Sequence, residues 1–179
     1  MSSPDLTSAE QDAVAAVLRT PDLSMGPQHK LFEHSIAKYA GRKHAIAVNS
    51  GTAGLHLCVR AMGITSGDMI ITTPFSFVAS SNTILYEGGI PVFVDVDALT
   101  GNIDVSQVQN AVNDINAGKT EKWLPRKGVE NAGKLKVIMP VDVFGQPVDI
   151  DPIHAIAKSN DLKTIEDSCE AIGAIYKDI

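Results

Sequence analysis

The sequence has 179 residues, of which 44% are hydrophobic and 20% are charged, so it has enough apolar residues to build a single globular core. There are 15 Lys and Arg against 21 Asp and Glu, which gives a formal net charge of -6. This composition excludes a disordered chain and provides no basic surface for nucleic acid or an anionic membrane.

Targeting, membrane and disulfide signals are also missing from the sequence. No apolar run approaches the ~20 residues that span a bilayer, and the first residues lack the basic and apolar regions of a signal peptide. The two cysteines, Cys58 and Cys169, are too few for a disulfide framework. The five histidines are scattered, and no pair has metal-ligand spacing. We therefore expect a cytoplasmic protein without a metal site, a nucleic-acid partner or a membrane partner.

The first forty residues predict two helices. Thr7 and Glu10 form a capping box, which opens a helix that runs to about Arg19. From Leu31 onward, apolar residues recur at near-helical spacing, and Gly41 is a suitable C-terminal cap for this second helix.

Beyond these helices, short apolar strands alternate with helices. Strands are expected at residues 45–48, 69–71, 91–94, 136–141 and 162–165, with a further short one at 174–176. Helices are expected at residues 51–62, 77–86, 104–115 and 151–158, the last capped by Asp151 with Pro152 at its first position. This alternation predicts an α/β fold, in which βαβ units form a mainly parallel sheet with helices on both faces. In such sheets, ligands bind beyond the carboxyl ends of the strands.

Residues 117–134 interrupt the alternation. This stretch is polar, rich in Lys and Gly, and contains Trp123, the only tryptophan. It is expected to be a long surface insertion between a helix and a strand. No Gly-x-Gly-x-x-Gly follows any predicted strand, so a dinucleotide fingerprint is missing.

Three segments at strand ends carry chemistry. In the first, residues 48–53, Gly51 allows a tight turn, and Thr52 adds a hydroxyl to the free amides of a helix N-terminus. This arrangement suits a phosphate, although an ordinary capped turn would have the same residues.

The second segment, residues 73–80, places Phe77 at the start of a helix, where its ring could stack on a flat heteroaromatic ligand. The alternative is that Phe75 and Phe77 belong to the core. In the third segment, residues 165–173, Asp167 directly follows a buried strand and could bond to a protonated ring nitrogen. A helix N-cap is the alternative there, and strand alternation should point Glu166 to the opposite face.

A phosphate, a ring face and a ring nitrogen are the three groups by which a protein holds pyridoxal 5′-phosphate (PLP). At this point the sequence resembles the DegT/StrS family of PLP-dependent sugar-nucleotide aminotransferases. The matching motifs occur in family order: Gly26-Pro27, Phe32-Glu33, Asn49-Ser-Gly-Thr-Ala53, Gly67-Asp68, Thr73-Pro-Phe-Ser-Phe77, Pro91-Val-Phe-Val-Asp95, Phe144-Gly-Gln-Pro147 and Ile165-Glu-Asp-Ser-Cys-Glu170. The resemblance runs from about residue 23 to the end, apart from residues 117–134.

The resemblance implies the type I fold of PLP-dependent transferases. Residues 1–22 would then be an N-terminal helical segment, and residues 23–179 part of the PLP-binding large domain with an insertion at about 117–134. The smaller C-terminal domain of the family would be absent. Family members are usually homodimers with active sites at the subunit interface, and they move an amino group, typically from glutamate, onto a keto-sugar nucleotide.

Six positions match cofactor contacts of the family: Gly51, Thr52, Ala53, Phe77, Asp167 and Glu170. The resemblance implies that the first three cradle the phosphate, the aromatic residue stacks on the pyridine ring, and the aspartate pairs with the ring nitrogen. Glu170 matches a position, most often Gln, that contacts the phenolic oxygen. A glutamate can donate a bond to that oxygen only when it is protonated.

The family's Schiff-base lysine follows the Asp167 segment and is therefore expected beyond Ile179, which leaves no catalytic residue in this chain. Lys177 lies too close behind the segment, and Lys163 lies at the wrong end of its strand. The chain is thus expected to be inactive by itself, as an N-terminal part of an aminotransferase. Two alternatives stay open: a sugar dehydratase of the same family, with histidine in place of the lysine, and a non-catalytic partner chain.

Overall fold

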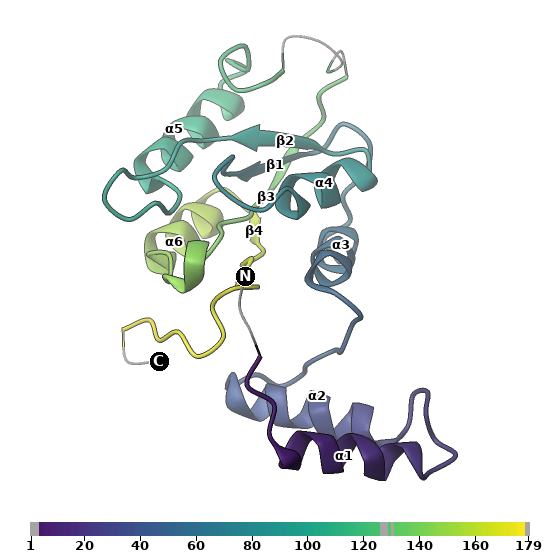
Figure 1. Cartoon of the computed structure of the whole chain (residues 1–179). Helices are drawn as coiled ribbons and strands as arrows, with labels where there is room; N and C mark the ends of the chain where they lie inside the picture. The colour runs from purple at the N-terminus through teal and green to yellow at the C-terminus, as the bar shows by residue number, and fades with distance from the viewer. Residues whose placement is uncertain (1–3, 126–128, 130, 178–179) are drawn as a thin grey trace. The chain divides into compact units, whose positions relative to one another are not determined.

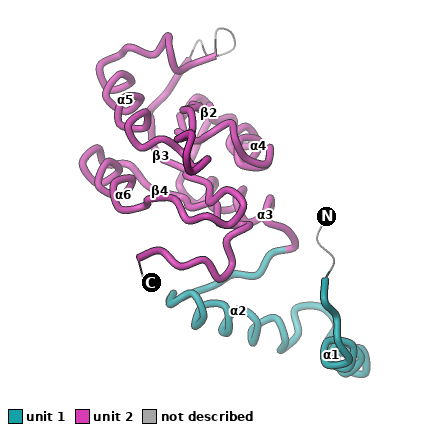
Figure 2. The backbone as a smooth tube through the Cα atoms, turned by 60° about the vertical axis from the view of Figure 1, so that its left-hand side comes forward, with its two compact units in different colours: residues 1–48 teal, residues 49–179 magenta. Residues whose placement is uncertain are grey.

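The structure, a computed structural model, describes residues 4–125, 129 and 131–177 (Figure 1). It divides into two compact units, residues 1–48 and residues 49–179 (Figure 2). A boundary is expected at residues 22–23, and both N-terminal helices lie in the first of these units. Within the described residues, no helix combines the length and the apolar character that crossing a membrane would need.

The first unit contains the two expected helices, α1 (Ser8–Leu18) and α2 (Pro27–Tyr39). The capping box of α1 is complete: Thr7 Oγ1 accepts from the N–H of Ala9, and Glu10 Oε2 accepts from the N–H of Thr7 at 2.7 Å. Helix α2 begins at Pro27, four residues before the first periodic apolar residue, because a proline is compatible with the first turn of a helix.

The strand expected at residues 45–48 is not formed, and that prediction was wrong. These residues have no ladder partner among the described strands, and the N–H of Ala47 instead donates to Glu33 Oε1 at 2.9 Å. The side chain of Ile46 is 80% exposed. An apolar run becomes a strand only where a neighbouring backbone supplies hydrogen bonds, and here a side chain takes that place.

The second unit is built on a four-stranded parallel sheet with the strand order β2-β1-β3-β4. Its strands are β1 (Met69–Thr72), β2 (Ile90–Phe93), β3 (Leu135–Ile138) and β4 (Lys163–Thr164). Its helices are α3 (Gly51–Ala61), α4 (Ala79–Tyr86), α5 (Val105–Asn116) and α6 (Ile150–Ser159), with a short 3-10 turn η1 (Val143–Gly145). The expected α/β class with a mainly parallel sheet is confirmed.

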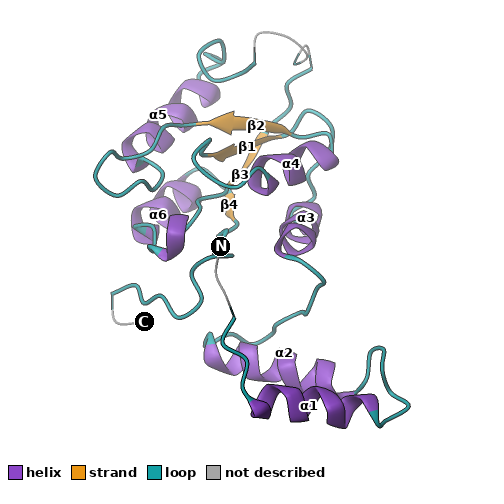
Figure 3. Ribbon diagram, viewed as in Figure 1, coloured by secondary structure: helices purple, strands orange, loops and turns teal. Residues whose placement is uncertain are grey.

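Helices cover both faces of this sheet, because strand residues alternate between two cores (Figure 3). Ile71 packs in one core with residues of α5 and α6, and its neighbour Ile70 packs in the other with residues of α3 and α4. Both isoleucines are fully buried. This arrangement leaves the carboxyl ends of the strands, and the loops that follow them, to form the site.

Three further predictions about elements need correction. Helix α6 is capped by Asp149 and not by Asp151, so Pro152 falls in the first turn, where an N–H has no partner within the helix anyway. Helix α4 begins at Ala79, two residues later than expected. Residues 174–176 form no strand. Instead, the hydroxyl of Tyr176 bonds to the carboxylate of Asp149, which ties this segment to the start of α6.

The stretch at residues 117–134 is not wholly a surface insertion. Trp123 is only 7% exposed, packs into the core beside α5, and donates from Nε1 to Asp114 Oδ2 at 3.0 Å. Residues 126–128 and 130 lie outside the described part of the chain. An indole with a hydrogen-bond partner can be buried at little cost, which explains how a polar segment anchors in the core.

Candidate functional site

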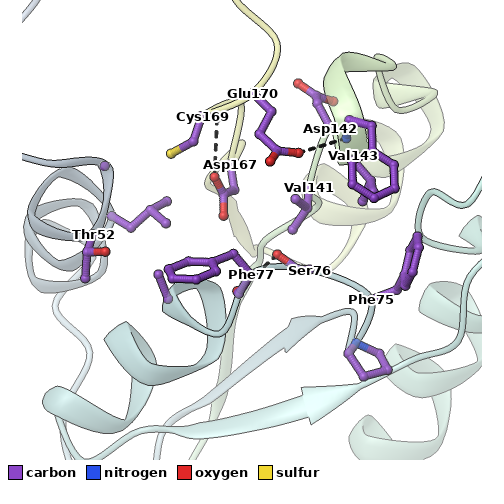
Figure 4. Close-up of a pocket in the computed structure, with 15 residues that line it drawn as sticks. Thr52, Phe75, Ser76, Phe77, Val141, Asp142, Val143, Asp167, Cys169 and Glu170 are labelled. Atoms are coloured by element: carbon purple, nitrogen blue, oxygen red, sulfur yellow. Dashed lines mark hydrogen bonds between the residues drawn. The ribbon is translucent and has the colours of Figure 1, made fainter. Parts of the chain in front are cut away.

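A cavity of about 540 Å³ lies in the second unit, where the loops after β1, β3 and β4 meet the N-terminus of α3 (Figure 4). Five of the six expected site residues line it: Gly51, Thr52, Phe77, Asp167 and Glu170. Its remaining lining residues are Leu55, Pro74, Phe75, Ser76, Ala79, Val141, Asp142, Val143, Phe144 and Cys169. Four segments that are far apart in the sequence thus line one cavity: residues 51–55, 74–79, 141–144 and 167–170.

The start of α3 forms one end of the cavity. Ser50 caps the helix, and its Oγ accepts from the N–H of Ala53 at 3.2 Å, so that amide serves the cap. Gly51 and Thr52, which occupy the first turn of the helix, line the cavity. A Cβ at Gly51 would lie 2.9 Å from Cys169 Sγ, so a side chain at this position would force the Cys169 side chain to move.

The aromatic residues of the second segment are not core residues. Phe77, just before α4, is 75% exposed, and its ring projects into the cavity (Figure 4). Phe75 is half-exposed and packs edge-on against Phe144, with ring centroids 6.0 Å apart. Large apolar rings left open at a cavity wall are suited to contact with a flat ligand.

Asp167 is held at the end of the sheet by its own backbone. Its N–H donates to the carbonyl of Pro140 at 3.0 Å, and its carbonyl accepts from the N–H of Asp142 at 3.0 Å. These bonds extend the β3–β4 pairing beyond β4, and they bury the residue to 6% exposure. No helix follows in residues 168–177, so the carboxylate is not a helix cap.

The side chain of Asp167 has two neighbours. Oδ2 accepts from the hydroxyl of Ser80 at 2.7 Å, and Oδ1 accepts a longer bond, 3.4 Å, from the N–H of Cys169. Burial, together with the neighbouring Asp167 carboxylate, raises the pKa of the Cys169 thiol to about 12. This thiol therefore stays protonated at neutral pH and is not a nucleophile.

Glu170 faces the loop after β3. Its Oε2 accepts from the backbone N–H of Phe144 at 3.0 Å. Phe144 has a φ of 53°, a left-handed conformation that is uncommon for a residue with a side chain. The next residue, Gly145, also has a positive φ, and a Cβ there would lie 3.0 Å from the carbonyl oxygen of Glu170.

Glu166 points away from these residues, as strand alternation predicted. It is exposed, and its Oε1 lies 3.8 Å from His154 Nε2 on α6.

Sequence reasoning missed two polar residues of the site. Ser80 is 1% exposed, and only its position one turn after Phe77 could have indicated it. Asp142 accepts from the N–H of Val148 at 2.8 Å and from the hydroxyl of Ser168 at 2.6 Å, which braces the loop of Phe144. Asp142 follows a strand just as Asp167 does, and that was the available signal.

Comparison with known proteins places this geometry in a family. The model of the DegT/DnrJ/EryC1/StrS aminotransferase family matches residues 4–179. GDP-perosamine synthase of Caulobacter vibrioides is 38% identical over 178 residues, which cover 99% of this chain and 43% of the synthase.

Solved structures agree with this match. The aminotransferase from Psychrobacter cryohalolentis has 35% identity and a TM-score of 0.81, over 97% of this chain and 40% of that one. A GDP-4-keto-6-deoxymannose-3-dehydratase with a trapped PLP-glutamate geminal diamine has 28% identity and a TM-score of 0.81, over 98% of this chain and 42% of that one. The chain therefore spans about two fifths of the length of these relatives.

The sheet, its cavity and these matches together define a PLP-dependent transferase fold of type I. The chain belongs to the DegT/DnrJ/EryC1/StrS aminotransferase family.

Proposed function

We propose that the second unit is the cofactor-binding part of a PLP-dependent aminotransferase that transfers an amino group, typically from glutamate, to a keto-sugar nucleotide. The observation that carries this proposal is that Asp167, Phe77 and the start of α3 line one cavity. The cavity volume of about 540 Å³ lies within the ~300–1,000 Å³ that is usual for small-molecule sites.

The surroundings of each expected residue support a role in binding the cofactor. Gly51 and Thr52 hold the phosphate at the positive end of α3, and Ala53 supports this turn through its bond to Ser50. Phe77 covers one face of the ring. PLP, when bound, supplies an electron sink, which requires a protonated ring nitrogen.

Asp167 holds the proton on that nitrogen. Its carboxylate is buried, and the bonds from Ser80 and Cys169 leave lone pairs of both oxygens available for a further donor. A charge-assisted bond in such a place is among the stronger hydrogen bonds in proteins. Glu170, held by the N–H of Phe144, is the neighbour of the phenolic oxygen in the proposal.

The amine that reacts with the cofactor is not assigned to any residue of this chain. None of the lysines in the described residues lines the cavity. Lys163 begins β4, and Lys177 donates to Asp151 Oδ2 at 2.7 Å, a bond that raises the pKa of its ammonium group. We therefore propose that the 179-residue chain binds the cofactor weakly and does not transaminate by itself.

We further propose that residues 23–179 belong to the large domain of the family and that the active protein is a homodimer.

A sugar dehydratase is the second candidate, because the dehydratase described above matches 98% of this chain with a TM-score of 0.81. The two activities share the cofactor pocket, and they differ in the residue that occupies the lysine position. A longer reading frame would distinguish them: lysine there supports the aminotransferase, and histidine supports the dehydratase.

Binding of pyridoxamine 5′-phosphate (PMP) to the 179-residue chain tests the cofactor site, because PMP needs no lysine. We expect saturable binding, measured by cofactor fluorescence, that Asp167→Asn weakens at least about tenfold, since one partner of a buried charge pair is lost. Asp161→Asn is the matched control, because Asp161 is exposed and its positive φ suits asparagine. Equal affinity of the two variants would contradict the proposed site.

A further inference from the structure

A short chain of hydroxyl groups leads from the cavity wall to Asp167. Ser80 Oγ lies 2.7 Å from Asp167 Oδ2 and 2.7 Å from Ser76 Oγ. Ser80 is 1% exposed and comes from the first turn of α4, whereas Asp167 follows β4, 87 residues later in the sequence. Figure 4 shows Ser76 and Phe77 below the Asp167 carboxylate.

The direction of these bonds follows from counting protons. An ionised carboxylate only accepts, so the single hydroxyl proton of Ser80 goes to Asp167. Ser80 Oγ can then accept from Ser76, whose hydroxyl also lies 3.2 Å from the carbonyl oxygen of Phe77. The bond from Ser80 to an ionised Asp167 is charge-assisted and therefore stronger than a bond between neutral groups.

The same serine lies against the backbone of the ring-stacking residue. Ser80 Oγ is 3.2 Å from the carbonyl oxygen of Phe77, and the N–H of Ser80 donates to that carbonyl at 3.2 Å. One residue thus links the group expected at the ring face to the group expected at the ring nitrogen.

We propose that Ser80 is a positioning residue, which holds the Asp167 carboxylate in the orientation that pairs with the protonated ring nitrogen of the cofactor. The inference rests on the proposed function, and it adds a residue that acts through Asp167 and does not line the cavity. An ionised carboxylate that bonds to a protonated ring nitrogen raises the pKa of that nitrogen, and the strength of the bond depends on its geometry. Without the bond from Ser80, the carboxylate is less well aligned, and the ring nitrogen loses its proton at a lower pH.

The test uses PMP labelled with ¹⁵N at the ring nitrogen, bound to the 179-residue chain and followed by NMR between pH 5 and 9. The ¹⁵N resonance reports directly whether the ring nitrogen carries a proton. For Ser80→Ala, we expect the resonance at pH 7 to move toward the unprotonated position. The midpoint of its titration should fall by about one pH unit, a tenfold change in the protonation equilibrium.

Two variants of similar size are the controls. Ser81→Ala makes the same substitution at the next position of α4, where the hydroxyl bonds only to the carbonyl of Val78 at 3.1 Å, and should leave the midpoint unchanged. Ser80→Thr keeps a hydroxyl and should titrate within a few tenths of a unit of the unsubstituted chain. If the far-ultraviolet circular dichroism shows that Ser80→Ala has lost helix, Ser80→Cys is used in place of Ser80→Ala. A thiol has a similar volume to a hydroxyl but is a poor hydrogen-bond donor, so the midpoint should fall by the same amount.

The outcomes separate this inference from the proposed function. The role of Ser80 is overturned if the midpoint is unchanged in Ser80→Ala or Ser80→Cys while Asp167→Asn loses ring protonation. That result leaves the proposed cofactor site intact. A midpoint that falls equally in Ser81→Ala also overturns it, because the effect would then be a general one of α4. If the unsubstituted chain does not bind PMP, or if Asp167→Asn protonates the ring normally, the proposed function fails, and the inference fails with it.

Discussion

Glu170 accepts a hydrogen bond from the backbone N–H of Phe144, at 3.0 Å, and so joins the loop after β4 to the loop after β3. Phe144 is held there in a left-handed conformation, with its side chain 81% exposed and edge-on to Phe75. An unusual backbone conformation persists where its surroundings over-determine it, and such residues cluster at functional sites. The carboxylate of Glu170 therefore has a structural task besides any contact with a cofactor.

Replacing Glu170 separates these two tasks. Glu170→Gln keeps an oxygen for the N–H of Phe144 and adds an amide donor, so we expect PMP affinity equal to the original or up to about threefold higher. Glu170→Ala leaves that N–H without its acceptor and should weaken PMP binding about tenfold, the size of a charge-assisted bond. Fluorescence titration measures both, and equal losses in the two variants would show that the charge itself is required.

A side chain at Gly51 should disturb the cavity, because a Cβ would lie 2.9 Å from Cys169 Sγ and would displace that side chain. We expect Gly51→Ala to weaken binding of PMP about tenfold but to affect pyridoxamine, which lacks the phosphate, much less. Cys169→Ala removes the clashing sulfur and, combined with Gly51→Ala, should recover most of the affinity. If the double variant binds no better than Gly51→Ala, the close approach to Cys169 is not the cause.

Lysine labelling tests whether this chain contains the reactive amine. After incubation with PLP, borohydride reduction and peptide mapping, we expect low, scattered labelling of surface lysines such as Lys119 and Lys122. These lysines do not line the cavity. Stoichiometric labelling of a single lysine, together with amination of a keto sugar, would refute the proposal that the nucleophile lies elsewhere.

Acid stability should depend on the ion pair of Asp68 and Lys136, whose charged atoms are 2.6 Å apart at the starts of β1 and β3. Burial by itself would raise the pKa of Asp68, but hydrogen bonds from Lys136 and Thr65 outweigh it and hold the pKa below the ordinary value. A carboxyl group whose pKa is lower in the folded state than in the unfolded state stabilises the fold at pH values above the unfolded-state pKa of about 4. This stabilisation is lost as the pH falls below that value toward the folded-state pKa.

Lys136→Met should therefore lower the thermal unfolding midpoint at pH 7, and the difference from the original chain should shrink as the pH falls below about 4. Lys158→Met, at the exposed end of α6, is the control and should change little at either pH. A deficit of Lys136→Met that is constant from pH 7 to pH 3 would mean that packing and not charge causes the loss.

The parallel sheet could be predicted because short apolar runs alternate with helices along the chain, although only β1 is buried throughout and β4 consists of Lys163 and Thr164. Residues 45–48 have the same pattern but lack a neighbouring strand, and the pattern does not encode whether a partner exists. For the same reason, residues 174–176 could not be distinguished from a strand. In these places, hydrogen bonds to the Glu33 carboxylate and from the Tyr176 hydroxyl take the place of strand pairing.

The site was predictable where polar residues follow strands. Asp167 and Thr52 belong to motifs that are contiguous in the sequence, and strand direction brings them to one edge of the sheet. Ser80 was not predictable, because its role depends on a partner 87 residues away. Trp123 was misjudged since its segment is polar, and burial of a single indole leaves no periodic signal.

The strand order β2-β1-β3-β4 also determines when the pocket can exist. All strand pairings within the sheet are parallel, so no hairpin within the sheet can form early, and the hydroxyl of Thr72 reaches the carbonyl of Met139 across 67 residues of chain. Folding dominated by such distant contacts is slow. On the ribosome, the start of α3 and Phe77 emerge long before Asp167, and they form no pocket until β4 has joined the sheet. A ligand that contacts the start of α3, Phe77 and Asp167 can therefore bind only after the sheet is complete. Its binding stabilises the whole sheet against unfolding.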